Sequence, residues 1–79
     1  MWNKITVCKT YLENDGIRRS YYDKFKIDDY TMARKKYAQL VGYYIPVDYC
    51  HVEITWKVYE DGRHFIIANW QNKEIENDI

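Results

Sequence analysis

The residues of this chain most able to do chemistry are two cysteines and two histidines: Cys8, Cys50, His51 and His64. Their spacing fits no metal motif, because neither C-x-x-C nor H-x-x-x-H occurs. With His51 on one strand and His64 opposite Tyr59 on its hairpin partner, the two imidazoles lie roughly 25 Å apart at about 3.3 Å per residue. We therefore expect no metal site and no cofactor.

Catalysis by a cysteine would need Cys8 and His64 on one face of a sheet, with an orienting acid and an oxyanion hole. No recognisable spacing supplies the last two, and phosphate-loop, dinucleotide-loop and hydrolase motifs do not occur. Of the acidic residues Asp23, Asp28 and Asp29, the last two are explained by capping a helix. We expect a protein that is not an enzyme.

The first elements that would position these residues are two strands over about residues 3–12 and 18–27. The turn sequence Glu13-Asn14-Asp15-Gly16 predicts a three-residue hairpin loop, with Gly16 at positive φ. An odd number of loop residues places the apolar residues of both strands on one side of the sheet: Ile5, Val7, Phe25 and Ile27.

A helix is predicted after this hairpin, capped by Asp28 or Asp29, running to about residue 41 and ended by Gly42. Its apolar stripe has helical spacing: Tyr30, Ala33, Tyr37, Leu40 and Val41. The basic triplet Arg34, Lys35 and Lys36 leaves that stripe and enters solvent, which makes it a secondary basic patch.

The second hairpin pairs residues 50–59 with residues 64–70, after an apolar connection over 43–49. Asp61-Gly62 predicts a tight two-residue turn, which sets the pairing. On the side away from the helix, the predicted cross-strand pairs are Tyr59 with His64, Lys57 with Ile66, Thr55 with Ala68 and Glu53 with Trp70.

The fold class is therefore α+β, with the order hairpin, helix, hairpin (ββαββ) and one helix packed on one face of a four-stranded, mainly antiparallel sheet. The chain of 79 residues forms a single domain, 1–79, with a frayed acidic tail over about 71–79. The element order resembles that of the β-grasp family, which includes ubiquitin-like domains. The resemblance covers the whole chain without a shared motif, so it implies no function.

The composition argues against several classes of protein. The net charge is zero, which argues against non-specific nucleic-acid binding and against a mimic of DNA. No apolar run is long enough to span a membrane and no secretion signal is present, so we expect a cytoplasmic protein with reduced cysteines. Aromatic residues make up 18% of the chain, which suits both a small core and a contact surface.

One helix covers only one face of such a sheet, so the aromatic and apolar residues of the other face need a partner or a cover. The candidate binding residues on that face are Tyr22, Lys24, Lys57, Tyr59, His64, Ile66 and Trp70. The cover could be the connection over 43–49 or the tail. The partner could be another protein, including a second copy of the chain.

The favoured function is a small non-enzymatic module that binds a protein and acts by occlusion. Its size, Tyr content and abundance of residues with AT-rich codons resemble inhibitors that phages and mobile elements direct against host enzymes or defence nucleases. The alternative is a single-stranded nucleic-acid-binding protein, because rings interleaved with Lys on an open sheet can stack on bases and meet phosphates. The triplet Arg34, Lys35 and Lys36 is a second candidate surface for nucleic acid.

Overall fold

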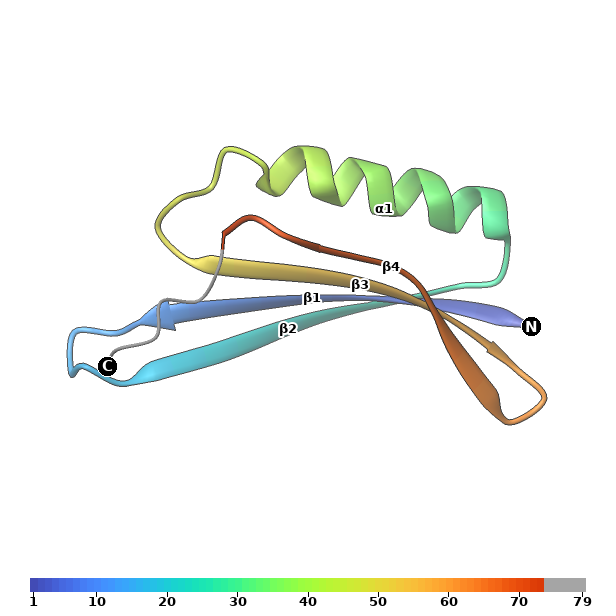
Figure 1. The fold of residues 1–79 in the computed structure, drawn as a ribbon, viewed down its shortest axis with the longest axis horizontal. Helices are drawn as coiled ribbons and strands as arrows, with labels where there is room; N and C mark the ends of the chain where they lie inside the picture. The colour runs from blue at the N-terminus through green and yellow to red at the C-terminus, as the bar shows by residue number, and fades with distance from the viewer. Residues whose placement is uncertain (74–79) are drawn as a thin grey trace.

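The computed structural model describes residues 1–73. Two hairpins flank one helix, in the predicted order ββαββ (Figure 1). The elements are β1 (Trp2–Leu12), β2 (Arg18–Ile27), α1 (Tyr30–Tyr44), β3 (His51–Glu60) and β4 (Arg63–Gln71). The α+β fold class predicted from the sequence is confirmed.

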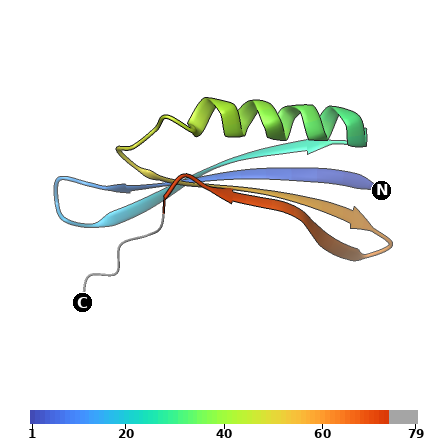
Figure 2. The ribbon, with the colours of Figure 1, turned by 45° about the horizontal axis from the view of Figure 1, so that its top comes forward.

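The strand order, which the sequence leaves open, is β2-β1-β3-β4, and each neighbouring pair is antiparallel. β2 and β3 therefore run in the same direction with β1 between them, and α1 crosses from one to the other over a single face of the sheet (Figure 2). The resemblance to the β-grasp family is confined to the order of elements along the chain.

The first hairpin closes as predicted. The Glu13 N–H donates to the Ile17 carbonyl and the Gly16 N–H donates to the Glu13 carbonyl, and both hydrogen bonds are 3.0 Å long. Three residues remain in the loop, and Gly16 has φ +80°, which a residue without a Cβ adopts readily. The odd loop places Ile5 opposite Phe25 on the side of the helix.

The core lies between α1 and the central strands β1 and β3. Its fully buried side chains alternate along the two strands, as expected for a sheet with one covered face: Ile5, Val7, Val52 and Ile54. Trp56 completes this layer and packs against the rings of Tyr30 and Tyr37, with centroids 5.1 and 5.8 Å away. The helix contributes the buried Ala33, which allows its backbone to approach the sheet.

One polar side chain, Asn3, is fully buried at the end of this core. It accepts a hydrogen bond from the Trp56 indole N–H at 3.1 Å and donates to the Ile27 carbonyl at 3.0 Å. The amide thus joins β1, the end of β2 and the central Trp56. Because a buried indole N–H needs an acceptor, Asn3 determines where the Trp56 ring can lie.

The helix begins as predicted and ends later. Asp29 caps it, with its carboxylate accepting from the Met32 N–H at 2.9 Å. The prediction that Gly42 ends the helix is wrong, since α1 continues to Tyr44. Pro46 explains the actual end, because it has no N–H to continue the hydrogen-bond series.

The connection after the helix does not cover the second face of the sheet. Its Val47 packs against the core, and the ring of its Tyr49 lies 6.3 Å from the ring of Tyr11 on the helix side. The sheet face away from α1, which we call the outer face, stays open over the described residues. By register it comprises Trp2, Lys4, Thr6, Cys8, Thr10, Leu12, Arg18, Ser20, Tyr22, Lys24, Lys26, His51, Glu53, Thr55, Lys57, Tyr59, His64, Ile66, Asn69 and Gln71.

The second hairpin follows its predicted register from the turn as far as the pair of Lys57 with Ile66 and departs from it after that pair. Tyr59 pairs with His64 and Lys57 pairs with Ile66, as predicted, but a β-bulge follows between Trp56 and Lys57. Ile67 is the extra residue, because Trp56 then pairs with Ala68.

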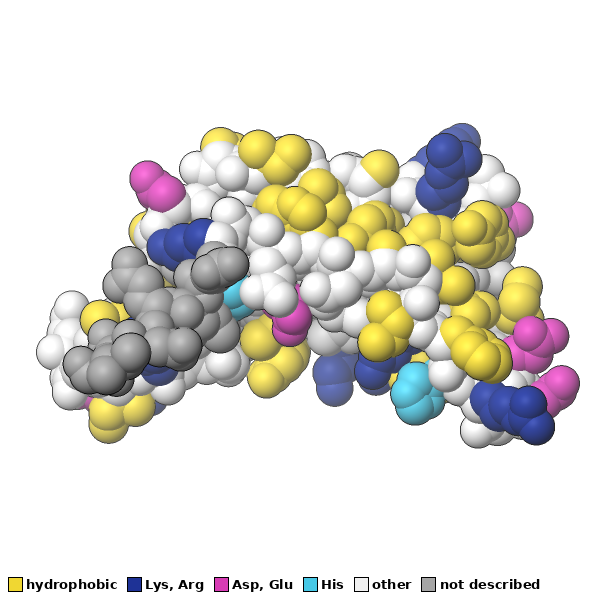
Figure 3. All heavy atoms as spheres, viewed as in Figure 1, with side chains coloured by type: hydrophobic (Ala, Val, Ile, Leu, Met, Phe, Trp, Pro, Cys, Tyr) yellow, Lys and Arg dark blue, Asp and Glu magenta, His cyan; other side chains and the backbone are white. Residues whose placement is uncertain are grey.

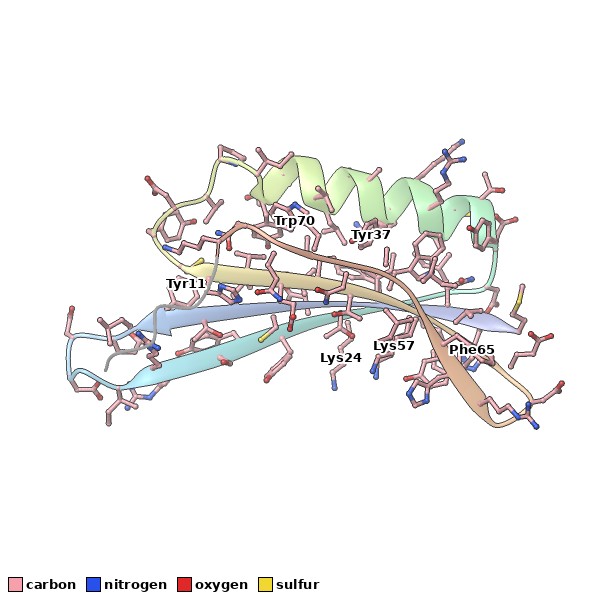
Figure 4. The ribbon with its side chains drawn as sticks, in the orientation of Figure 1. Tyr11, Lys24, Tyr37, Lys57, Phe65 and Trp70 are labelled. Carbon is pink, nitrogen blue, oxygen red and sulfur yellow. The ribbon has the colours of Figure 1, made fainter. Side chains whose placement is uncertain are left out.

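One extra residue moves every later side chain to the other face. The predicted pairs of Thr55 with Ala68 and of Glu53 with Trp70 are therefore wrong. Trp70 pairs with Ile54 instead and lies half-buried on the helix side (Figure 4). It is removed from the outer face, as is Ala68.

The chain stays ordered beyond β4. The Asn72 side chain donates to the carbonyls of Val47 at 2.8 Å and Cys50 at 2.9 Å, and it accepts from the Val52 N–H at 2.9 Å. The frayed acidic tail over about 71–79 stays a prediction, since 74–79 lie outside the described residues.

Trp70→Ala is expected to lower the free energy of unfolding by about 2 kcal/mol, because it removes a half-buried ring from the core. Ile66→Ala is the matched control on the same strand, since Ile66 is 63% exposed. It should change stability by less than about 0.5 kcal/mol. Urea denaturation of both variants makes the comparison, and equal stabilities would contradict the placement of Trp70.

Asn3→Ala is expected to lower the free energy of unfolding by about 2 kcal/mol, because the Trp56 indole N–H is left buried without an acceptor. In a Trp56→Phe background the same change should cost much less, since no indole N–H remains. A double-mutant cycle by urea denaturation measures the difference. Equal costs in both backgrounds would show that the Asn3–Trp56 bond does not matter.

Candidate functional site

The centre of the outer face holds a row of lysines. Lys4 on β1 pairs directly with Lys26 on β2 and with Lys57 on β3. Neighbouring strands are about 4.8 Å apart, so the backbones that carry these three lysines lie within about 10 Å of one another. Lys24 lies two residues before Lys26 on β2 and therefore on the same face. Figure 4 shows Lys24 and Lys57 pointing away from the helix. We call Lys4, Lys24, Lys26 and Lys57 the lysine cluster.

Folding alone does not explain this cluster. Like charges directly opposite each other destabilise a sheet, and Lys4 and Lys57 are half-buried. Within residues 1–73 no ion pair with a carboxylate involves the cluster; the ion pairs found there join Lys9 to Asp23 and Arg19 to Asp15. Among the described residues, the cluster is therefore a positive patch without an ion-pair partner, on a chain of zero net charge.

A row of rings lies beside the lysine cluster. The rings of Trp2 and Tyr59 stack with centroids 4.3 Å apart and planes 6° apart, and His64 follows at 5.5 Å from Tyr59. The Lys26 ammonium lies over Trp2, 4.9 Å from the ring centroid. Tyr59 and Lys26 thus contact the ring faces of Trp2. This row therefore offers mainly ring edges to a ligand.

The sequence analysis missed Trp2. Its predicted strand began at residue 3, whereas β1 begins at Trp2. The available signal was the alternation itself, because Trp2 continues the series of Lys4 and Thr6 on one face.

Next to the lysine cluster the outer face is hollowed to about 360 Å³. Ammonium groups, hydroxyls, one thiol and one carboxylate line this hollow: Lys4, Thr6, Cys8, Tyr22, Lys24, Glu53, Thr55 and Lys57. The volume is at the lower end of that of small-ligand sites. The lining suits a ligand that carries negative charge and several polar groups.

Tyr22 stands at the β2 side of the hollow and is exposed. The Cys8 thiol beside its hydroxyl raises the pKa of Tyr22 above its usual value. Tyr22 therefore keeps its proton at neutral pH, and its hydroxyl can donate a hydrogen bond to a ligand.

Glu53 is the one carboxylate that the described strands place on the outer face. Its Oε2 accepts from the Gln71 side-chain amide at 3.0 Å and from the Asn69 amide at 3.4 Å. Asn69 also donates to the Thr55 hydroxyl at 2.8 Å. These contacts from β4 fix the direction of the carboxylate at the edge of the hollow.

The structure brings most of the predicted site residues together. Tyr22, Lys24 and Lys57 line the hollow, and Tyr59 and His64 belong to the row of rings. Ile66 pairs with Lys57 at the edge of the sheet. Trp70 is the exception, because the bulge places it in the core.

The secondary basic patch lies on the helix, on the other side of the sheet. Arg34 and Lys35 are exposed, but Lys36 is half-buried with its ammonium 4.5 Å from the centroid of Phe25. The expectation that all three enter solvent is therefore wrong for Lys36, and the patch does not extend the lysine cluster.

The open edge of β4 carries a second feature, a run of exposed apolar side chains. Phe65, Ile66 and Ile67 are 52%, 63% and 41% exposed, because α1 packs over β1, β2 and β3. Figure 3 shows hydrophobic side chains gathered along β4 and towards its hairpin. We call these three residues the apolar edge.

The two cysteines are free and lie on opposite sides of the sheet. Cys50 is buried in the core and Cys8 lines the hollow, so they do not meet. In the described part of the chain, no group of three or more potential ligands could hold a metal ion, and no helix is long and apolar enough to cross a membrane.

Comparisons with protein-family models, with curated proteins and with solved structures found no match. The outer face and the apolar edge are therefore the features of this chain that bear on its function.

Cys8 is expected to react with iodoacetamide in the folded protein, whereas Cys50 should react only in urea. The reason is that Cys8 lines an open hollow and Cys50 is 4% exposed. Intact mass should show one added group without denaturant and two with it. Two added groups in the folded state would contradict the assignment of Cys50 to the core.

Proposed function

We propose that this protein is a non-catalytic, cytoplasmic binding protein that holds single-stranded nucleic acid on its outer face. The observation that carries the proposal is the lysine cluster, in which Lys26, Lys4 and Lys57 oppose one another across three strands and form no ion pair with a carboxylate of residues 1–73. An arrangement that costs stability within the fold is explained if a polyanion neutralises it in the complex.

The hollow favours a single strand over a duplex. Phosphates would lie on the ammonium groups, and an unpaired base could enter the space beside Thr6, Thr55 and Tyr22. The bases of a duplex are stacked and paired, so they could not enter it. Tyr22 is the ring available for stacking, because Trp2 and Tyr59 already cover each other.

The corrected register also changes the balance between the two functions predicted from the sequence. The contact surface predicted for a protein partner included Trp70, which packs on the helix side together with Ala68. The face that remains carries the same lysines and is less apolar than predicted. This supports the nucleic-acid alternative over the protein-binding one for this surface.

A protein-binding function is the second candidate, and the apolar edge favours it. Phe65, Ile66 and Ile67 lie on an edge strand whose outward backbone groups could pair with a strand of another protein. On this second proposal, the protein would be an inhibitor from a phage or mobile element that blocks a host enzyme or defence nuclease. A homodimer through β4 is the other form of this proposal.

Lys4→Gln should weaken binding of a labelled single-stranded DNA several-fold at low salt. It should also lower the slope of log affinity against log salt by about 0.7, because one fewer phosphate is neutralised. Thermal stability should stay equal or rise, since a like-charge pairing is removed. Fluorescence anisotropy at two salt concentrations and a thermal melt measure both effects.

Lys35→Gln is the matched control, because it removes one exposed lysine on the opposite side of the molecule. Equal losses in the two variants would contradict an outer-face site. Absence of binding even at tens of micromolar would reject the nucleic-acid function. A dimer in sedimentation equilibrium that Ile66→Lys dissociates would then favour the apolar edge.

A further inference from the structure

We infer that Glu53 makes the hollow selective for bases with an exocyclic amino group, so that cytosine is bound in preference to uracil. The inference rests on the proposed function and assigns a specificity-determining residue to its site. Glu53 is the one carboxylate in a lining whose other charged groups are Lys4, Lys24 and Lys57. Since it repels phosphate, it does not serve the backbone of the nucleic acid, and a different group of the ligand must face it.

The carboxylate is held in place and still has a free oxygen. Gln71 and Asn69 both donate to Oε2, at 3.0 and 3.4 Å. Over residues 1–73, no donor contacts Oε1. Glu53 pairs directly with Cys8, and both residues line the hollow. A rigid acceptor without a donor is suited to select a ligand that supplies one.

The chemistry of the bases decides which ligand that is. Cytosine carries a donor at N4, whereas uracil carries an acceptor, O4, at the same position. A carboxylate accepts and cannot donate, so uracil would place two acceptors against each other. Adenine and guanine also carry amino donors, and they should be accepted on the same ground. The hydroxyls of Thr6 and Thr55 can serve the acceptor atoms of the base.

Glu53 also helps to hold β4, and that role alone would not produce selectivity. Glu53→Gln separates the two roles, because glutamine keeps the length of the side chain and one acceptor oxygen for Gln71. It loses the charge and gains an N–H that can donate to O4 of uracil. The fold should therefore persist while the preference disappears.

The test compares oligomers of deoxycytidine and deoxyuridine of equal length by fluorescence anisotropy at neutral pH. The wild-type protein should bind the cytidine oligomer roughly tenfold more tightly, the effect of one hydrogen bond to a charged acceptor. In Glu53→Gln the ratio should fall to near one, mainly because uridine binds better. Lys4→Gln is the control, since it should weaken both oligomers and leave their ratio unchanged.

Equal wild-type affinities for the two oligomers would overturn the selectivity and leave the proposed function standing. Binding of neither oligomer would reject the proposed function itself. A preference that persists in Glu53→Gln would show that another residue determines it, which also overturns the inference.

Should Glu53→Gln fail to fold, alkylation of Cys8 in the wild-type protein replaces the variant. Saturating cytidine oligomer should slow that alkylation, because the base and Cys8 share the hollow. Alkylation at an unchanged rate would place the base elsewhere and overturn the inference.

Discussion

The β-bulge opposite Trp56 is the constraint on which both faces of the sheet depend. Trp56 is 4% exposed and fills the space beneath Tyr30 and Tyr37. The extra residue, Ile67, brings the small Ala68 opposite this ring, where an unbroken ladder would have placed an isoleucine. The bulge therefore leaves room in the core for the largest side chain of the central strands, whose indole N–H bonds to Asn3.

The same extra residue builds the outer face. It turns Trp70 towards the core and brings the amides of Asn69 and Gln71 beside Glu53, at 3.4 and 3.0 Å. In an unbroken ladder a tryptophan would have stood opposite Glu53, on the hollow. Core packing and site geometry are thus coupled through the register of β4, because side chains alternate between faces with a period of two.

The elements were predictable from the sequence because their signals are local. Asp29 caps the helix, Gly16 takes the positive φ of its loop, and the Asp61-Gly62 turn fixes the first pairs of the second hairpin. The bulge was not predictable in this way, because no local signal marks it, and it lies opposite Trp56, which packs against the distant Tyr30 and Tyr37 of the helix. The stretch from Ile66 to Trp70 has apolar residues at both odd and even positions. We interpreted this pattern as a strand with two apolar faces. The β4 residues between the turn and the bulge kept their predicted faces and those beyond it did not, so the predicted face was right for Ile66 and wrong for Trp70.

A net charge of zero conceals how the charges are distributed. Acidic residues such as Asp15 and Asp61 lie in the two hairpin turns, which are at opposite ends of the sheet (Figure 1), whereas the lysine cluster lies on the strands themselves. Asp61 follows Lys57 by four residues, about 13 Å at 3.3 Å per residue, which exceeds the Debye length of about 8 Å at physiological salt. Lys4 is within that length of each of its two partners, whereas the turns lie beyond it. The proposed function therefore depends on the charge of the outer face and not on the net charge of the chain, and among the described residues Glu53 is the single carboxylate on that face.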